Sequence, residues 1–288
     1  MSHLMNNYGR LPVSFDHGQG VWLWDKEGHK YLDALAGIAV NSVGHAHPRL
    51  VRAIADQASK LIHCSNYFNI DLQEQVAEKL VEHSGLEAVF FCNSGLEANE
   101  CAIKIARKFG HAKGIEVPNI IVLKHAFHGR SIATLSATGN PSVREDFSPY
   151  TEGFIFVDES DLDGIRKIVE ENKNVVAIFF EPILGEGGVV PVDLSVIKGI
   201  REICDEHDLL MMCDEVQCGM GRSGKWFAHQ WAEIKPDVIT MAKGLAGGVP
   251  VGAVVVSKKA NIFKPGNHGS TFGGNPLAMR AALETLSI

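Results

Sequence analysis

Short apolar runs recur along the chain, and stretches of helical periodicity stand between them. The runs are rich in β-branched and aromatic residues, which predicts buried strands. Strands that alternate with helices indicate an α/β fold, in which helices cover both faces of a mostly parallel sheet. The seven predicted strands are 88–92, 120–124, 154–157, 175–180, 209–213, 238–241 and 252–256.

The segments between these strands set the topology. Apolar positions 98, 102, 105 and 109 predict a helix at 96–109, and less regular patterns predict helices at 162–170 and 195–207. Only residues 243–251 separate the last two strands, too few for the crossover helix that a parallel connection needs. We therefore predict a seven-stranded, mostly parallel sheet with one antiparallel strand, the last in the chain.

The N-terminal part has a different pattern. Apolar residues at 21–24 and 30–32 flank a polar turn at 25–28, which predicts a hairpin, and a helix is expected at 48–61. We assign residues 1–60 to an N-terminal segment, part of a smaller domain, and residues 61–288 to one large domain. The chain stops within a helical pattern at 276–286, so we expect the rest of the smaller domain to lie outside this chain.

The composition is that of a globular protein. Hydrophobic residues make up 45% of the 288 residues, and 27 Lys and Arg against 34 Asp and Glu give a net charge of −7. This charge favours neither nucleic acid nor an acidic membrane as a partner. Six cysteines without a CxxC pair, and an N-terminus without an apolar signal segment, predict a cytoplasmic protein.

Polar residues that can react or bind a ligand follow most of the predicted strands. In an open parallel sheet, ligands bind beyond the carboxyl ends of the strands, so these groups predict one deep site. A lone lysine after a strand is usually a surface residue, and the convergence with the other groups decides against that interpretation. The groups are Asn93-Ser94-Gly95, the segment from His125 to Arg130, Glu181, Asp214 and Lys243.

Lys243 and Asp214 are the two groups that a pyridoxal phosphate site needs. A primary amine forms a Schiff base with the cofactor, and a carboxylate keeps the pyridine nitrogen protonated. We predict that the fifth strand continues through Gln217, so that its period of two puts Asp214 and Val216 on one face, toward the same ring. A structural ion pair remains the alternative for Asp214, and Phe127 is either a core residue or stacks on a flat cofactor.

Ser94 and Gly95 open the helix that follows the first strand of the sheet. Free amides at a helix N-terminus suit a phosphate, while Ser94 and Glu97 also have the spacing of a capping box. Both interpretations stay open. His45 and His47 stand two residues apart without a nearby third ligand, so we predict no metal site there.

At these positions the sequence resembles the class III, or ω-amino acid, aminotransferases, which are pyridoxal phosphate enzymes of fold type I. The resemblance covers nearly the whole chain. The matching stretches are Gly37 to Asn41, Gly44 to Pro48, Asn93 to Glu100, Ala126 to Arg130, Glu181 to Ile183, Gly185 to Gly188, Asp214 to Gln217, Met241 to Gly244 and Ser270 to Pro276.

The resemblance implies a role for each matched residue. Lys243 is expected to carry the cofactor and to move a proton, and Asp214 to pair with the ring nitrogen. Gln217 is expected to contact the ring hydroxyl, while Phe127 and Val216 enclose the ring. The implied cofactor contacts are Ser94, Gly95, Leu96, Phe127, Asp214, Val216, Gln217, Lys243 and Thr271.

The resemblance also implies partners. The phosphate is expected to bind the amides of Gly95 and Leu96 together with Thr271 of the partner subunit, which makes a homodimer the working unit. Arg130 is expected to hold the substrate α-carboxylate by a bidentate fork. Glu186 resembles the gate that neutralises a second arginine, and Ser270 belongs to the implied substrate site.

The implied reaction moves the terminal amino group of N-acetylornithine to 2-oxoglutarate, giving N-acetylglutamate semialdehyde and glutamate, a step of arginine biosynthesis. Alternatives are ornithine, succinylornithine or 4-aminobutyrate as donor, another reaction of the same fold, or an inactive truncated homologue. The sequence departs from the family pattern at Leu96, where a small residue or threonine is usual, and at Leu184, where glutamine is frequent. The second arginine is expected in the part of the family's length that lies beyond this chain.

Overall fold

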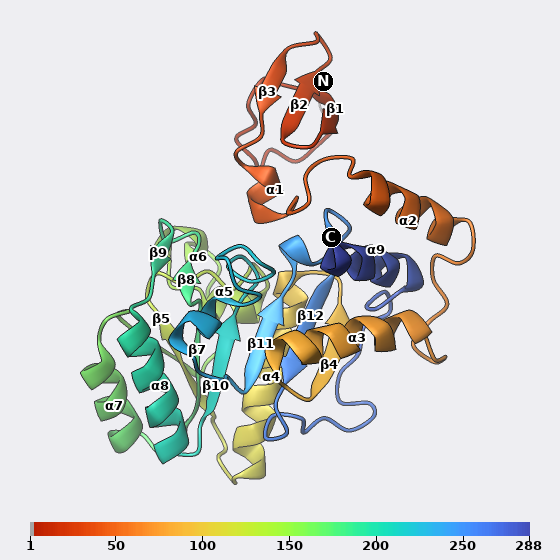
Figure 1. The fold of residues 1–288 in the computed structure, drawn as a ribbon. Helices are drawn as coiled ribbons and strands as arrows, with labels where there is room; N and C mark the ends of the chain where they lie inside the picture. The colour runs from red at the N-terminus through yellow and green to blue at the C-terminus, as the bar shows by residue number, and fades with distance from the viewer. Residues whose placement is uncertain (1–2) are drawn as a thin grey trace.

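The computed structural model describes residues 3–288 and is built around a seven-stranded sheet (Figure 1). Only β12 runs antiparallel to its two neighbours, so the predicted topology is confirmed. In spatial order, the strands are β4 (Ala88–Cys92), β12 (Gly252–Val256), β11 (Val238–Met241), β10 (Leu210–Asp214), β7 (Val175–Phe180), β5 (Asn119–Leu123) and β6 (Phe154–Val157).

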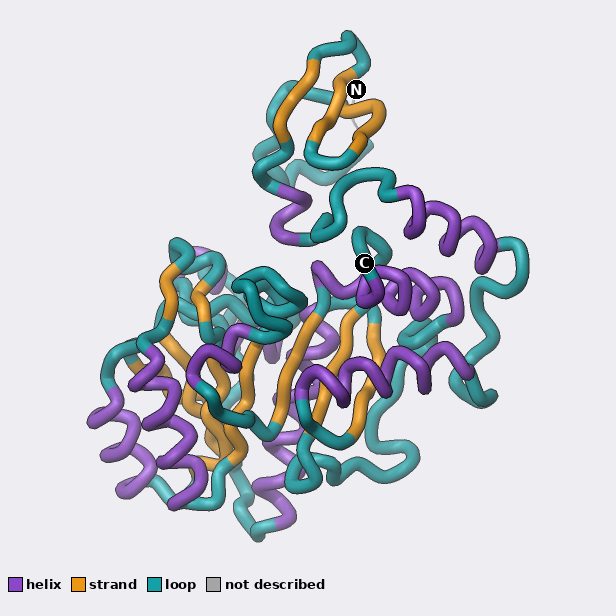
Figure 2. Tube along the Cα trace, viewed as in Figure 1, coloured by secondary structure: helices purple, strands orange, loops and turns teal. Residues whose placement is uncertain are grey.

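Helices cover both faces of this sheet because successive strand residues point to opposite sides. In β5, Ile120 and Val122 pack against α4 (Gly95–Ala112), whereas Ile121 and Leu123 pack with α7 (Leu162–Glu171) and α8 (Leu194–Glu206). At the other end of the second face, α3 (Asp71–Ser84) and α9 (Pro276–Ser287) cover β4, β12 and β11 (Figure 2). Burying a large apolar side chain contributes roughly 1.5–3 kcal/mol, so these layers hold the sheet rigidly.

The N-terminal strands form a separate three-stranded antiparallel sheet, which stands apart from the main sheet in Figure 1. It consists of β1 (Phe15–Gln19), β2 (Trp22–Asp25) and β3 (Lys30–Leu32); the hairpin of β2 and β3 confirms the prediction, whereas β1 was not predicted. The Asp25 carboxylate accepts the backbone N–H groups of Glu27 and His29 at 3.0 and 2.8 Å, which fixes the turn.

Two short segments lead from this sheet to the main body, α1 (Ala36–Ala39) and α2 (Pro48–Ala58). α2 lies against α9, and the Arg49 guanidinium donates to the Glu284 carboxylate across this contact at 2.7 Å. The remaining elements are α5 (Ile132–Ala137), α6 (Pro141–Arg144), β8 (Ile183–Leu184), β9 (Val190–Pro191) and the 3-10 turns Ala228–Ala232 and Lys243–Ala246. Within residues 3–288, no helix is long and apolar enough to cross a membrane.

One prediction about the strands is wrong. The fifth strand, β10, ends at Asp214 and does not continue through Gln217. Asp214 Oδ1 accepts the backbone N–H of Val216 at 3.0 Å, and this side-chain contact turns the chain out of the strand. The helices predicted at 96–109 and 48–61 exist with shifted ends, at 95–112 and 48–58.

Candidate active site

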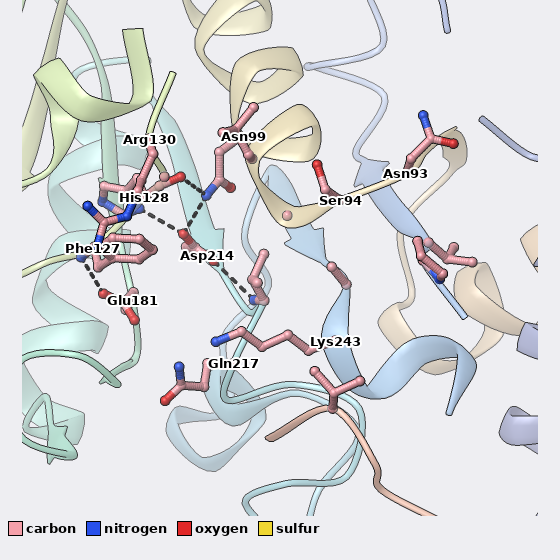
Figure 3. A pocket seen from close by; sticks show the side chains of 18 of the residues that line it. Asn93, Ser94, Asn99, Phe127, His128, Arg130, Glu181, Asp214, Gln217 and Lys243 are labelled. Carbon is pink, nitrogen blue, oxygen red and sulfur yellow. Dashed lines mark hydrogen bonds and ion pairs between the residues drawn. The ribbon is translucent and has the colours of Figure 1, made fainter. Parts of the chain in front are cut away.

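A cavity of about 500 Å³ opens beyond the carboxyl ends of the strands (Figure 3). This is the edge where a parallel sheet presents its loops to a ligand. Of the twelve residues that the sequence assigns to the site, nine line this one cavity although they come from four separate segments. These nine are Ser94, Gly95, Leu96, Phe127, Arg130, Asp214, Val216, Gln217 and Lys243.

Lys243 follows β11 by two residues and begins a 3-10 turn. Its φ of 37° lies in the left-handed region, which a side chain with a Cβ rarely adopts; such backbone strain is concentrated at functional sites. Burial lowers the pKa of the half-buried ammonium, while Asp214, Glu186 and Glu181 act to raise it. Burial therefore favours the neutral amine, which is the nucleophilic form.

Asp214 is the fixed acid of the cavity. Its Oδ1 accepts from Val216 N–H at 3.0 Å, and its Oδ2 accepts from Asn99 Nδ2 and His128 Nδ1, both at 2.8 Å (Figure 3). The His128 ring stacks on Phe179 with centroids 4.2 Å apart, and His128 and Asp214 are both almost fully buried. A buried carboxylate held by three donors keeps a fixed direction, which a ligand in the cavity can use.

Asn99 and His128 were not assigned a role from the sequence, although both lie in motifs that carry the family resemblance. A signal existed for Asn99, because it stands beside Ala98 in the buried part of α4, where a polar side chain needs a buried partner. His128 gave no such signal, since its partner Asp214 is 86 residues away in the sequence.

The first turn of α4 combines the two predicted functions. Ser94 Oγ accepts the backbone N–H of Glu97 at 3.2 Å, which caps the helix. The Glu97 carboxylate reaches the backbone N–H of Asn93 at 2.5 Å and not that of Ser94, so the reciprocal half of the capping box is shifted by one residue. Gly95 and Leu96 are the first two helical residues, and their N–H groups have no partner within the helix.

Gly95 is required by close packing. A Cβ at this position would lie 2.6 Å from Val216 Cγ1, much closer than side-chain atoms approach. The glycine therefore lets Val216 reach into the cavity directly beside the unpaired helix amides.

Arg130 and Glu186 lie at a second cavity, of about 330 Å³, which also touches Phe127. The exposed Arg130 guanidinium lies 5.7 Å from the centre of the Phe127 ring. Among residues 3–288 it has no ion-pair or hydrogen-bond partner, which leaves its planar donors available to a carboxylate. Phe127 and Arg130 line both cavities, so the two cavities are neighbours.

The structure does not bring Ser270 and Thr271 to the cavity of Lys243. Both border another hollow, of about 380 Å³, and Thr271 is exposed. Ser270 Oγ accepts from Asn93 Nδ2 at 3.1 Å and from Gly273 N–H at 2.9 Å, so it shapes its own loop. The implied cofactor contact of Thr271 was placed in a partner subunit, and it stays a prediction.

Pyridoxal phosphate fits the residues that are present. Unpaired helix amides at Gly95 and Leu96 suit its phosphate, and the fixed Asp214 carboxylate, three of whose four lone-pair sites are used, suits a pyridinium N–H. Lys243 supplies the amine, and the side chains of Phe127 and Val216 border the space between. Bound there, the cofactor supplies an electron-withdrawing ring that carries the amino group between two substrates.

Comparisons with known proteins agree with this arrangement. The family described as aminotransferase class-III matches residues 4–288. The acetylornithine aminotransferase of Nitrosomonas europaea is 56% identical, and the match covers 100% of this chain and 74% of that protein.

Two solved structures show the same fold. The ornithine aminotransferase of Toxoplasma gondii has a TM-score of 0.95 at 36% identity, covering 99% of this chain and 68% of that chain. The N-acetylornithine aminotransferase of Stenotrophomonas maltophilia has a TM-score of 0.82 at 38% identity, covering 97% and 69%. The chain therefore belongs to the class III aminotransferases, pyridoxal phosphate enzymes of fold type I.

Proposed function

We propose that the protein transfers the terminal amino group of N-acetylornithine to 2-oxoglutarate, using pyridoxal phosphate in the cavity of Lys243. The observation that carries the proposal is the unpaired Arg130 guanidinium at the junction of the two cavities. A planar guanidinium binds an α-carboxylate through two parallel N–H donors. The acetylornithine aminotransferase of Nitrosomonas europaea, at 56% identity, supports the same donor.

The site residues of the chain each have a defined task in this proposal. Lys243, whose pKa burial lowers, holds the cofactor and then moves a proton between the donor carbon and the cofactor. Asp214 keeps a proton on the ring nitrogen, and Asn99 and His128 hold Asp214 in place.

The remaining cavity residues bind and orient. In this proposal the side chains of Phe127 and Val216 enclose the ring, and Gln217 contacts its hydroxyl. Arg130 fixes the donor so that its terminal amine points to Lys243. Glu186, exposed at the second cavity, acts in this proposal as the gate for the second substrate.

We also propose a homodimer in which Thr271 of the partner subunit contacts the phosphate. Three large apolar side chains near Thr271 support such an interface: Tyr67 is 96% exposed, Phe68 69% and Phe272 61%. Asn66 Nδ2 donates to the carbonyls of Ser270 and Gly273, which brings the Tyr67 and Phe272 segments together. An apolar patch of this kind marks a protein interaction site.

The proposed domains are residues 1–60 and 61–288, because the sheet of β1 to β3 has its own hydrogen bonding. We further propose a cytoplasmic location, supported by five thiols that are buried as small apolar groups in the core.

The test is the donor half-reaction, in which a donor alone converts the cofactor in the absence of 2-oxoglutarate. We expect N-acetylornithine to react with a specificity constant at least about tenfold above that of 4-aminobutyrate, which presents its carboxylate differently. Arg130→Lys should remove most of that preference, because an ammonium lacks the two parallel donors. Ornithine belongs in the same panel, since a solved ornithine aminotransferase has the same fold. Equal constants for N-acetylornithine and 4-aminobutyrate, or a ratio unchanged in Arg130→Lys, would refute the donor assignment.

A further inference from the structure

One buried carboxylate lies behind the residues that contact the donor. Glu181 follows β7 directly and is only 4% exposed. Its Oε1 accepts the backbone N–H of Phe127 at 2.8 Å, and its Oε2 accepts the backbone N–H of Gly185 at 3.1 Å (Figure 3 shows the first). A single carboxylate thus joins two loops that are far apart in the sequence.

These two loops form two walls of the second cavity, and the start of α6 lines the rest. One contains Phe127 and Arg130, and the other is the tip of the β8–β9 hairpin, which begins at Gly185 and includes Glu186. The walls already touch, because a Cβ on Gly187 would lie 2.9 Å from the His125 carbonyl oxygen. Their relative position therefore sets the distance between Arg130 and Glu186.

We propose that Glu181 is a positioning residue for the amino donor, and that only its ionised carboxylate can hold both walls of the cavity. This inference rests on the donor binding proposed above. Each oxygen of a carboxylate accepts an N–H strongly, whereas the hydroxyl oxygen of a protonated carboxyl carries a proton and is a weaker acceptor. Protonation therefore leaves one of the two amides, that of Phe127 or that of Gly185, without a strong acceptor.

Several charged or titratable groups face Glu181. They are Asp214 at the end of β10, His128 after β5, Lys243 after β11 and Cys218 in the loop after β10. Burial raises the pKa of Glu181 to about 7, and the Asp214 carboxylate adds to the rise, while His128 and the two amide bonds oppose it.

The sign of the pH effect follows from this direction. We call the two bonds from the Phe127 and Gly185 amides to Glu181 the clamp. The clamp is complete above about pH 7 and is lost as pH falls through that value. An unfolded glutamate ionises near 4.3, so between that pH and about 7 the folded chain keeps a proton that the unfolded chain releases. Global stability thus falls as pH rises across this window, in the opposite direction to the clamp. A loss of order at the two loops at low pH is therefore distinguishable from general unfolding.

The direct test is amide hydrogen exchange on the purified chain, with the intrinsic pH dependence of exchange divided out. In the wild-type protein, protection at Phe127 or Gly185 should fall about tenfold between pH 8 and pH 6, the size expected for a bond to a charged acceptor. Glu181→Gln should show reduced protection at one of the two amides at both pH values, because a carboxamide offers one acceptor. The proposal is wrong if protection of the Phe127 and Gly185 amides does not depend on pH and is unchanged in Glu181→Gln.

A matched control is Glu284→Gln, which changes another buried carboxylate that lines neither of the two cavities. It should lower stability through Arg49 and Arg280 without altering exchange at Phe127 or Gly185. In the donor half-reaction, Glu181→Gln should raise KM several-fold more than it lowers kcat and should flatten the limb of the pH profile near 7. The wild-type exchange series needs neither a variant nor a reaction, so it tests the clamp even if the donor assignment fails.

Discussion

Asp214→Asn separates the structural and chemical tasks of the fixed carboxylate. Asn99 and His128 both donate to Oδ2, so the single carbonyl oxygen of asparagine takes that place. Its NH₂ group then faces the Val216 N–H, and the bond at 3.0 Å is lost. One unmade buried hydrogen bond costs about 1–3 kcal/mol, against a typical total stability of about 5–15 kcal/mol. The variant should therefore fold.

The chemical loss should be much larger than the loss of stability suggests. A neutral amide does not hold a proton on the ring nitrogen of the cofactor, so the preorganised charge that the reaction needs is missing. Removing a charge-stabilising group of this kind lowers the rate by at least about 10² to 10³. We would measure single-turnover rates of the donor half-reaction by stopped flow, and stability by urea unfolding.

Asp237→Asn is the matched control. Asp237 is similarly buried at 7% exposure, and its Oδ2 accepts from Met211 N–H at 3.0 Å and from Arg201 at 2.9 Å. It precedes β11 at the opposite end of that strand from Lys243, so its variant should lose stability while keeping the half-reaction rate. If Asp214→Asn also stayed within a few-fold of the wild-type rate, Asp214 would be a structural residue and the reasoning would fail.

Two further predictions concern the cofactor. Borohydride reduction of the protein with pyridoxal phosphate should label Lys243 alone, and Lys243→Ala should abolish the label; since burial lowers the pKa of Lys243, the attachment rate should level off below the pH expected for an exposed lysine. Label on another lysine would contradict the assignment. The loaded protein should sediment as a dimer, and mixing Lys243→Ala with Thr271→Ala chains should restore one intact site per mixed dimer. A loaded monomer, or a mixture no more active than its components, would exclude a contact of Thr271 across the interface.

The inner strands of the main sheet were predictable because they are buried on both faces. In β7 all six residues are buried, so the apolar run marks the whole element. The direction of β12 also followed from the sequence, because the segment before it is too short for a crossover. β1 was missed because it contains Asp16, His17 and Gly18 in place of an apolar alternation, and its backbone pairs with β2 at the edge of the small sheet.

The groups of the site that sit at strand ends were also predictable, since topology alone brings the ends of parallel strands together. Nine of the predicted residues meet in one cavity for this reason. The end of β10 was not predictable from periodicity. Val216 stands two residues after Asp214, as the next position on the same strand face would, whereas the contact of its N–H with the Asp214 side chain turns the chain. Asp214 and Val216 still line the same cavity, because the turn keeps both residues together at the end of β10.

The partners of the supporting residues could not be identified in advance, because each residue acts through a backbone group or a distant side chain. Asn99 contacts the carbonyl of His128 and the carboxylate of Asp214, and Glu181 contacts two amides that any residue would offer. A sequence motif records the identity of the supporting residue and says nothing of its partner. Residues that contact a ligand can thus be predicted from chemistry and topology together. Residues that orient them are identified only from the interatomic distances in the structure.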